Sequence, residues 1–338
     1  MQEDLQAFFR QGIFLSISPK TLLVGWGELK QQENPASSQA SFYSPDFFLK
    51  EEKPWIVPEH CSEVDIEEFQ GGLTHKLSQN ISLNWKGADL SFFREQVEDL
   101  KIHFSTGKLS KAVPIVFEES SLLKGFHEIA FRNLLPFCSK LNLFGFWTEE
   151  EGILGATPEI LFESNRPGHF QTMALAGTDP SHKKDCSREH QVVIEDIATS
   201  LKKYGRVDVQ ATQTVEFAYL AHLRTLIELE TREPLTFLDL ISILHPTAAL
   251  GAIPKPQGRK WLEKLNQKQD RRCFGAPFGV LWPNGNAKVV VAIRNVQWDK
   301  EKMILGAGCG VLEGVDCEQE WKEIQLKISS VKKMMGFV

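Results

Sequence analysis

Long apolar runs are missing from this sequence of 338 residues. No segment approaches the roughly 18 consecutive apolar residues that a transmembrane helix requires. The first residues, MQEDLQAFFRQGIF, carry acidic side chains early, and no long apolar stretch before small residues follows, as it would in a secretory signal peptide. The sequence therefore predicts no membrane partner, and we expect a cytoplasmic protein.

An excess of positive charge is also missing. Lysine and arginine number 38 against 44 aspartate and glutamate residues, so the formal net charge is −6 and the pI is about 5.9. This balance disfavours nucleic acids and anionic membrane surfaces as partners, because both attract basic proteins. A protein of this charge that binds an anion must do so with a local cluster of donors or with a metal ion.

Cysteine is sparse and follows no metal-binding pattern. The six cysteines form no Cys-x-x-Cys pair, which argues against zinc and predicts reduced thiols. Internal repeats and low-complexity tracts are absent as well. The segment GAGCGV at 306–311 is not a dinucleotide-binding fingerprint, because its third glycine is out of register and Asp316 follows too soon to bind a ribose.

The clearest chemical pattern that is present is the stretch 305–327, LGAGCGVLEGVDCEQEWKEIQLK. Its first half has a glycine at every second position, so an extended chain would present bare backbone on one face: Gly306, Gly308 and Gly310. Bare backbone lets an anion approach amide groups closely. Its second half places two carboxylates and a lysine at helical spacing: Glu320, Glu323 and Lys327.

The helical half of this stretch has two interpretations. Carboxylates on one helical face can hold a divalent cation, and a lysine one turn further on can hold a negative group beside it. A solvated Glu–Lys pair explains the same spacing and stabilises a helix by only about 0.2–0.5 kcal/mol. The charged residues border the apolar stripe of a helix predicted over 318–335, which consists of Trp321, Ile324, Ile328, Val331 and Met335.

Hydrophobic periodicity predicts a mixture of strands and helices along the rest of the chain. Short strands are expected over residues 1–70, with a polar loop at 31–41. The further elements expected in order are a helix at 89–109, a strand at 111–117, a hairpin at 140–164, a strand at 170–178, a helix from the N-cap Ser187 to a stop at Gly205, a helix ended by His245–Pro246, and a hairpin at 273–298.

Four more charged residues are candidates for chemistry: Lys111, Glu159, Glu189 and Arg294. Lys111 begins a predicted strand, where a solvated sheet edge is the ordinary expectation. Glu159 lies among apolar residues, where burial would raise its pKa as a general acid requires, unless it faces solvent. Glu189 either binds a ligand or complements a helix dipole. Arg294 ends the run VVVAIR and either binds a carboxylate or forms a structural ion pair.

Seven blocks, in this order, resemble the chorismate-utilising enzymes: LSKAV, LGATPEILF, ALAGT, REHQVV, LHPTAALG, FGAPFGVLW with VAIR, and LGAGCGVLEG with EQEWKEIQLK. That family includes isochorismate synthase, salicylate synthase, and component I of anthranilate and aminodeoxychorismate synthases. The resemblance implies an α+β fold, a two-lobed antiparallel β-sandwich with outer helices. It implies a single chorismate-binding domain over 1–338, with a divergent N-terminal part at 1–85 and a catalytic core at 105–335.

The resemblance also implies where magnesium and chorismate bind. Glu189 and Glu323 match the Mg²⁺ ligands, and Glu320 matches a further acidic residue near the metal. Arg294 matches the arginine that holds the enolpyruvyl carboxylate, and Lys327 the lysine beside the ring carboxylate. The full set of positions implied to bind substrate is Thr178, His245, Phe274, Arg294, Gly306, Gly308 and Lys327.

A few positions distinguish among the members of the family. Lys111 matches the lysine that activates water in isochorismate and salicylate synthases. Ala176 stands where aminodeoxychorismate synthases have a nucleophilic lysine, and Phe274 and Ala249 are similar to isochorismate synthases. We therefore expect a magnesium-dependent isochorismate synthase. Lys111 would take a proton from the water that attacks C2, and Glu159 would donate one to the departing C4 hydroxyl.

Alternatives within the family stay open. Salicylate synthase would also eliminate pyruvate, an aminating component I would need a glutaminase partner, and a non-catalytic protein would only bind chorismate. For isochorismate synthase we expect no obligatory glutaminase partner, a monomer or weak dimer, and a product used for menaquinone or a siderophore. The chain departs from the usual pattern at Pro114, with no arginine after Lys111, and at Ala248, where HPTP has become HPTA.

Overall fold

The computed structural model describes residues 2–72, 80–177, 186–217 and 220–338. Within these residues sixteen strands form one large sheet and three short strands form a second. The large sheet contains β1 (Gly12–Ser18), β2 (Thr21–Gln32), β3 (Ser41–Tyr43), β4 (Trp55–Asp65), β6 (Ile115–Ser121), β7 (Asn142–Trp147), β8 (Gly152–Thr157), β9 (Ile160–Arg166), β10 (His169–Ala176), β11 (Gly205–Val209), β12 (Gln213–Phe217), β13 (Leu220–Thr231), β15 (Pro277–Leu281), β16 (Ala287–Val291), β17 (Asn295–Trp298) and β18 (Lys302–Gly308). The short sheet contains β5 (Lys111–Ala112), β14 (Ala252–Ile253) and β19 (Val311–Leu312).

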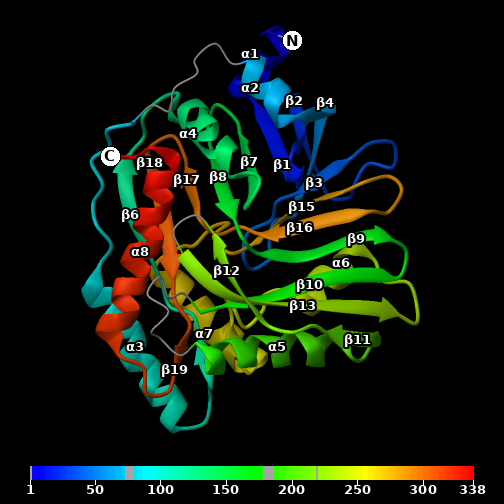
Figure 1. The fold of residues 1–338 in the computed structure, drawn as a ribbon. Coiled ribbons are helices and arrows are strands. Elements are labelled where there is room, and N and C mark those ends of the chain that lie inside the picture. Colours follow the sequence, from blue (N-terminus) through cyan, green and yellow to red (C-terminus); the bar gives the residue numbers. More distant parts are fainter. Residues whose placement is uncertain (1, 73–79, 178–185, 218–219) are drawn as a thin grey trace.

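All the strand pairs in both sheets of the described chain are antiparallel. The order in the large sheet is β11-β13-β10-β9-β16-β15-β3-β4-β2-β1-β7-β8-β17-β18-β6, with β12 also beside β13. The N-terminal strands β1 to β4 therefore lie in the middle of the order, between two halves built from later segments (Figure 1). Helices and an antiparallel sheet in one chain confirm the predicted α+β class.

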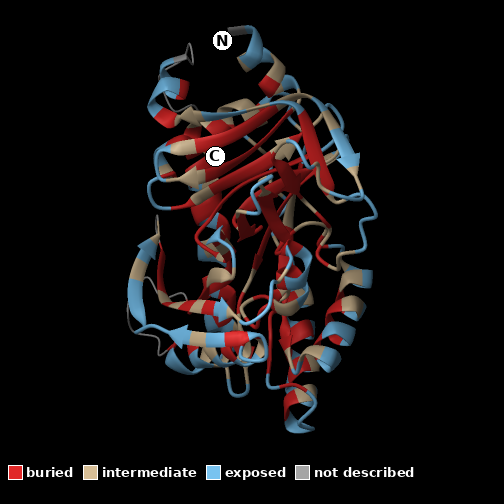
Figure 2. Cartoon of the chain, turned by 90° about the vertical axis from the view of Figure 1, so that its right-hand side faces the viewer, coloured by how far each residue is buried: buried red, intermediate tan, exposed pale blue. Residues whose placement is uncertain are grey.

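Helices cover the sheet and complete its core. They are α1 (Gln2–Arg10), α2 (Ile66–Gly72), α3 (Leu90–Ser105), α4 (Phe126–Leu134), α5 (Ser187–Leu201), α6 (Phe237–Leu244), α7 (Lys255–Lys268) and α8 (Cys317–Met335), with a 3₁₀ turn at Leu135–Phe137. Helix α5 packs on β10 and β13, and α8 packs on β18 and α4. Buried residues concentrate on the inner strands, whereas β11, β12 and the outer helix faces are exposed (Figure 2). None of the described helices combines the length and apolar character needed to cross a membrane.

Helix α8 matches the sequence prediction closely. Asp316 caps its first turn by accepting a hydrogen bond from Glu318 N, and Gly336 ends it in a left-handed conformation with φ 78°. All five residues of the predicted apolar stripe are buried. These signals are local, and for that reason they could be found in the sequence.

Two predicted strands are broken, in both cases at a proline. The strand expected over 111–117 divides at Pro114 into β5, in the short sheet, and β6, in the large one. The second strand of the hairpin expected over 140–164 divides at Pro158 into β8 and β9, which have different neighbours. Proline has no N–H for a β ladder, so each strand ends there and its continuation joins other partners.

The N-terminal region and the helix after Ser187 also differ from the expectation. Residues 2–10 form helix α1, whereas strands were expected throughout 1–70. Cys186 rather than Ser187 is the N-cap of α5, without a side-chain cap, and the helix ends at Leu201. Gly205 begins β11 instead of ending the helix, because its main chain pairs with Thr231 of β13.

Candidate functional site

One cavity of about 60 Å³ is lined by many of the residues singled out by the sequence, among them eight of those expected to bind substrate or metal or to transfer protons. They come from both halves of the sheet and from two helices: Glu159, Glu189, Phe274, Arg294, Gly306, Gly308, Glu323 and Lys327. Helix α5 supplies Glu189, α8 supplies Glu323 and Lys327, and β18 supplies the two glycines. The fold thus joins an alternating glycine strand, three carboxylates and two cations at one place.

The break between β8 and β9 sets the position of Glu159. Pro158 ends the ladder, Glu159 O accepts a hydrogen bond from Val291 N at 3.0 Å, and Glu159 N donates to Thr157 Oγ1 at 3.2 Å. With its main chain held on both sides, the residue presents its side chain to the cavity. It is 3% exposed, which contradicts the solvent-facing alternative.

The environment of Glu159 determines its protonation. Burial raises its pKa to about 8, although Lys111, Lys327 and Arg294 each lower it. At neutral pH the carboxyl group is therefore protonated and can donate a proton. Lys111 has the largest lowering effect of the three cations, so this lysine acts most strongly on the acid.

Arg294 joins β16 to β17 in a left-handed backbone conformation with φ 55°. A non-glycine residue costs about 1–2 kcal/mol in that region, and such strain clusters at functional sites. The guanidinium is 8% exposed and lines the cavity, where Nη1 donates to Ser330 Oγ at 3.1 Å. Burial lowers its pKa to about 10, while Glu323 and Glu159 raise it, so the side chain is cationic at neutral pH.

The guanidinium of Arg294 is available to an anion. Among the residues that the structure describes, no carboxylate forms an ion pair with it, so the structural-pair alternative has no support. An arginine presents a planar fork that matches a carboxylate. The left-handed turn aims that fork into the cavity instead of along the sheet.

Lys327 and Glu323 form the i,i+4 pair expected on α8, with Nζ and Oε1 2.8 Å apart. The pair is not a solvated one, because the two side chains are only 15% and 7% exposed. Lys327 Nζ also donates to Gly308 O at 2.7 Å, which ties α8 to the glycine strand. The two halves of the stretch 305–327 thus meet at the amine of Lys327.

Lys111 is completely buried, contrary to the solvated edge that its strand position suggested. Its Nζ donates to the carbonyl of Ala248 and lies 3.5 Å from Glu189 Oε1. Gly310 packs against this pair: a Cβ there would be 1.8 Å from Glu189 Oε1 and 3.0 Å from Lys111 Cε. Glycine at 310 is therefore what leaves room for the lysine and the carboxylate.

The three carboxylates proposed as metal ligands all influence the pKa of the Cys309 thiol. Burial raises the pKa of that thiol, and Glu320, Glu323 and Glu189 raise it further. Within the described ranges, no group of three such side chains is assembled at metal-binding distance. Instead, Glu189 and Glu323 each face a lysine. The donors suit a hard divalent cation, because carboxylate oxygens are the ligands that Mg²⁺ prefers.

Two predicted substrate-binding positions are not placed at the cavity. His245 follows the end of α6, and its Nε2 is 2.7 Å from Phe47 O, beside a separate surface pocket. Burial lowers the pKa of His245 to about 3, so the ring is neutral and held by the main chain. Thr178 lies outside the described residues.

No sequence pattern pointed to His222, which lines the cavity from β13. Its Nδ1 is 3.0 Å from Gly177 O, and burial lowers its pKa to about 3, so the ring is neutral. Gly177 has φ 73°, and a Cβ there would be 2.3 Å from Cys186 Cβ. The signal that could have found His222 is a polar residue in the apolar run LAHL.

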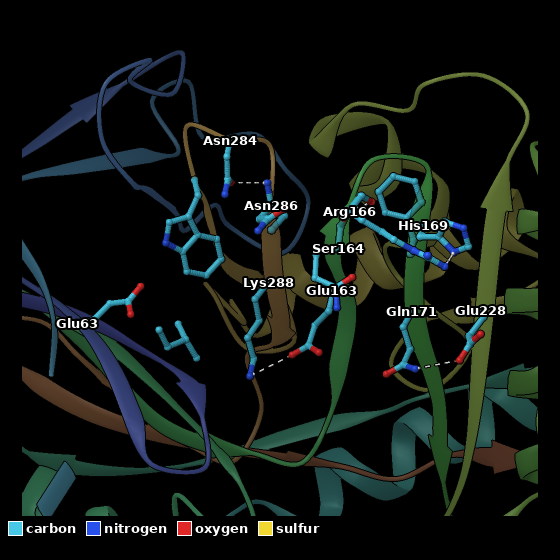
Figure 3. A pocket seen from close by; sticks show the side chains of 15 residues that line it. Glu63, Glu163, Ser164, Arg166, His169, Gln171, Glu228, Asn284, Asn286 and Lys288 are labelled. Carbon is cyan, nitrogen blue, oxygen red and sulfur yellow. Dashed lines mark hydrogen bonds and ion pairs between the residues drawn. The ribbon is translucent and has the colours of Figure 1, made fainter. Parts of the chain in front are cut away.

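A larger hollow of the described surface, about 820 Å³, lies elsewhere (Figure 3). Its polar side chains pair with one another: Lys288 Nζ lies 3.1 Å from Glu163 Oε1, and Gln171 Nε2 donates to Glu228 Oε1 at 3.3 Å. It contains none of the residues singled out by the sequence. We therefore place the candidate site at the smaller cavity, where groups with altered pKa values and cations meet.

The chain is similar to known proteins in sequence and in fold. Residues 74–336 match the family model described as "Chorismate binding enzyme". Over 288 residues the chain is 27% identical to the isochorismate synthase MenF of Pasteurella multocida, covering 78% of this chain and 64% of that protein. Over 202 residues it is 30% identical to the salicylate biosynthesis isochorismate synthase of Pseudomonas aeruginosa, covering 55% of this chain and 42% of that protein.

The chain spans less than two thirds of the length of these two relatives. Its fold is similar over 96% of its length to that of the menaquinone-specific isochorismate synthase MenF from Escherichia coli, with a TM-score of 0.77 and 19% identity, covering 88% of that chain. At that identity the likeness concerns the fold alone.

Proposed function

This chain belongs to the family of chorismate-binding enzymes, and we propose that its own reaction converts chorismate to isochorismate. The observation that carries the proposal is a buried acid and a buried amine that act on each other. Glu159 is protonated at neutral pH, and among the cations Lys111 affects its pKa most. Exchange of one hydroxyl group for another requires a proton donor and a proton acceptor on one substrate.

The residues in and beside the cavity have two roles: some bind the substrate, and others transfer protons. Arg294 binds the enolpyruvyl carboxylate and Lys327 the ring carboxylate, through charge-assisted hydrogen bonds. Lys111, in its uncharged amine form, accepts a proton from a water molecule as that water bonds to C2. The ring double bonds shift, the C4–O bond breaks, and Glu159 gives its proton to the leaving hydroxyl. One water enters and one leaves, and solvent returns the proton from Lys111 to Glu159.

We propose magnesium as the cofactor, with Glu189, Glu323 and Glu320 as the side chains that would hold it. When bound, the ion would offset the charge of the ring carboxylate and orient it. Glu189 and Glu323 each lie beside a lysine, so each carboxylate is already paired with a positive charge, as it would be with the magnesium ion.

Two observations favour isochorismate over the other products. Ala176 lines the cavity where the aminodeoxychorismate branch has a nucleophilic lysine, so that route lacks its nucleophile. The two relatives described above both carry isochorismate synthase in their names. We also propose that the chain acts without a glutaminase partner.

Incubation of the purified protein with chorismate and Mg²⁺ is expected to give isochorismate, identified by chromatography. Release of pyruvate would instead indicate a salicylate synthase, and turnover only with ammonia would indicate an aminating enzyme. Binding of chorismate without turnover, in a folded and metal-replete sample, would leave a binding protein.

Gly310→Ala is expected to fold normally but to need about 10- to 100-fold more Mg²⁺ for half-maximal rate, the range typical of a disturbed metal environment. The new methyl group would meet the flexible end of the Glu189 side chain. That carboxylate can move aside without disturbing the core, but it then leaves the position in which it would bind the metal. A Mg²⁺ titration of the rate and a thermal melt measure the two effects. Gly87→Ala is the matched control, because a Cβ at 87 meets nothing within 4 Å. An unchanged Mg²⁺ requirement would contradict the role of Glu189.

A further inference from the structure

The amine of Lys111 is held by a segment that is itself anchored to helix α5. Lys111 Nζ donates to the carbonyl of Ala248, in the loop between α6 and β14. The same loop returns to pair Ile253 with Lys111 in the short sheet. Ala248 N donates to Asp196 Oδ2 at 2.9 Å. A path of hydrogen bonds therefore runs from α5 through residue 248 to the lysine.

Asp196 is placed for this contact by its helix. It lies seven residues, about two turns, after Glu189 on α5, so both side chains project from the same side of the helix. Its side chain is 9% exposed. Oδ1 lies 3.4 Å from the half-exposed Lys255 Nζ, and Oδ2 takes the N–H of Ala248. The carboxylate thus holds residue 248 from within the protein rather than from solvent.

Ala248 links the hydrogen bond from Asp196 to the hydrogen bond from Lys111. The N–H and the C=O of Ala248 flank the same α-carbon, so holding the N–H restricts where the C=O points. That C=O is the acceptor of the Lys111 amine. The contact exists because residue 248 is alanine: proline, which is usual at this place in the HPTP block, has no N–H to donate.

We propose that Asp196 is a positioning residue which, through Ala248, holds the amine of Lys111 in place beside Glu189, a residue that lines the cavity. The inference rests on the proposed function, in which Lys111 accepts the proton of the attacking water. Loss of the anchor would let the amine drift, and a misplacement of about 1 Å can lower a rate by about 10²-fold.

A double-mutant cycle tests this role. Asp196→Ala and Ala248→Pro are each expected to lower kcat about 10- to 100-fold, with KM changed less than about twofold. The double variant should be no slower than the slower single variant, because both changes remove the same hydrogen bond. Asp196→Asn keeps an acceptor oxygen but loses the charge facing Lys255, and should retain most of the rate. Glu195→Ala, on the exposed side of α5, is the matched control.

Multiplicative effects in the cycle, or a normal rate for Asp196→Ala, would overturn the proposal. If Ala248→Pro does not fold, the comparison of Asp196→Ala with Asp196→Asn still tests the proposal. Equal rates for these two variants would contradict the positioning role of Asp196. Hydrogen exchange at the Ala248 amide, followed by NMR without substrate, should be at least about tenfold faster in Asp196→Ala. If exchange is faster in Asp196→Ala but the wild-type protein does not turn over chorismate, the proposed function is refuted and the hydrogen bond between Asp196 and Ala248 is still supported. If exchange is unchanged, the positioning role of Asp196 is refuted.

Discussion

Glu159→Gln is expected to lower kcat for chorismate by about 10²–10⁴-fold, while chorismate binding in the presence of Mg²⁺ changes less than tenfold. Glutamine keeps the size of the side chain and its hydrogen-bonding capacity but has no acidic proton. Product formation and calorimetric binding measure the two quantities. Retention of the full rate would remove Glu159 as the acid.

The pH dependence gives this prediction a second readout. The active form of Glu159 is protonated, and burial raises its pKa to about 8. The value of kcat/KM, which reports the free enzyme, should therefore fall about tenfold per pH unit above about pH 8. The residual activity of Glu159→Gln should lack this alkaline limb. A wild-type rate that stays flat to pH 9.5 would contradict the assignment.

The pH dependence of folding stability should also reflect the ionisation of Glu159. The folded-state pKa of Glu159 is raised from its ordinary value of 4.5 to about 8, so the folded protein holds the proton more tightly than the unfolded chain. This contribution to stability is full below pH 4.5 and is lost as pH rises through 8. Thermal melts should show Glu159→Gln gaining on the wild type as pH rises from 4.5 to about 8. Glu163→Gln, in β9 and outside the cavity, should match the wild type in activity and is the control.

Lys111→Met is expected to lower kcat by about 10²–10⁴-fold as well, because it removes the proposed proton acceptor. Methionine keeps an unbranched stem in a site with no solvent exposure, so loss of packing is limited. Steady-state product formation measures the effect, and Lys108→Met, at a neighbouring exposed lysine, is the control.

The same variant makes a prediction about the acid. Lys111 is the cation that lowers the pKa of Glu159 most, so its removal should raise that pKa further. The alkaline limb of the residual activity should then move above pH 8. If Lys111→Met keeps the wild-type rate, a different group must accept the proton; if the limb does not move, the two residues do not act on each other.

Local patterns in the sequence were sufficient for much of the fold. Helix α8 was predicted with its apolar stripe, because the spacing of its side chains is encoded within a few turns. The α+β class followed from the family blocks. The breaks at Pro114 and Pro158 were not predicted, although both prolines are visible, because the sheet that each half-strand joins depends on partners far along the chain.

The sequence by itself determined the chemical identities and the family: the alternating glycines, the carboxylates at helical spacing, and the ordered blocks that surround them. Only the tertiary structure decided between interpretations that depend on burial. Lys111 could have been a solvated edge, and Glu323–Lys327 a surface pair, until the loop at 245–254, α5 and β18 enclosed them. His245 lies in a family block and yet turns to Phe47. Burial, and with it the pKa of Glu159, arises from contacts between distant segments, and no local spacing specifies those contacts.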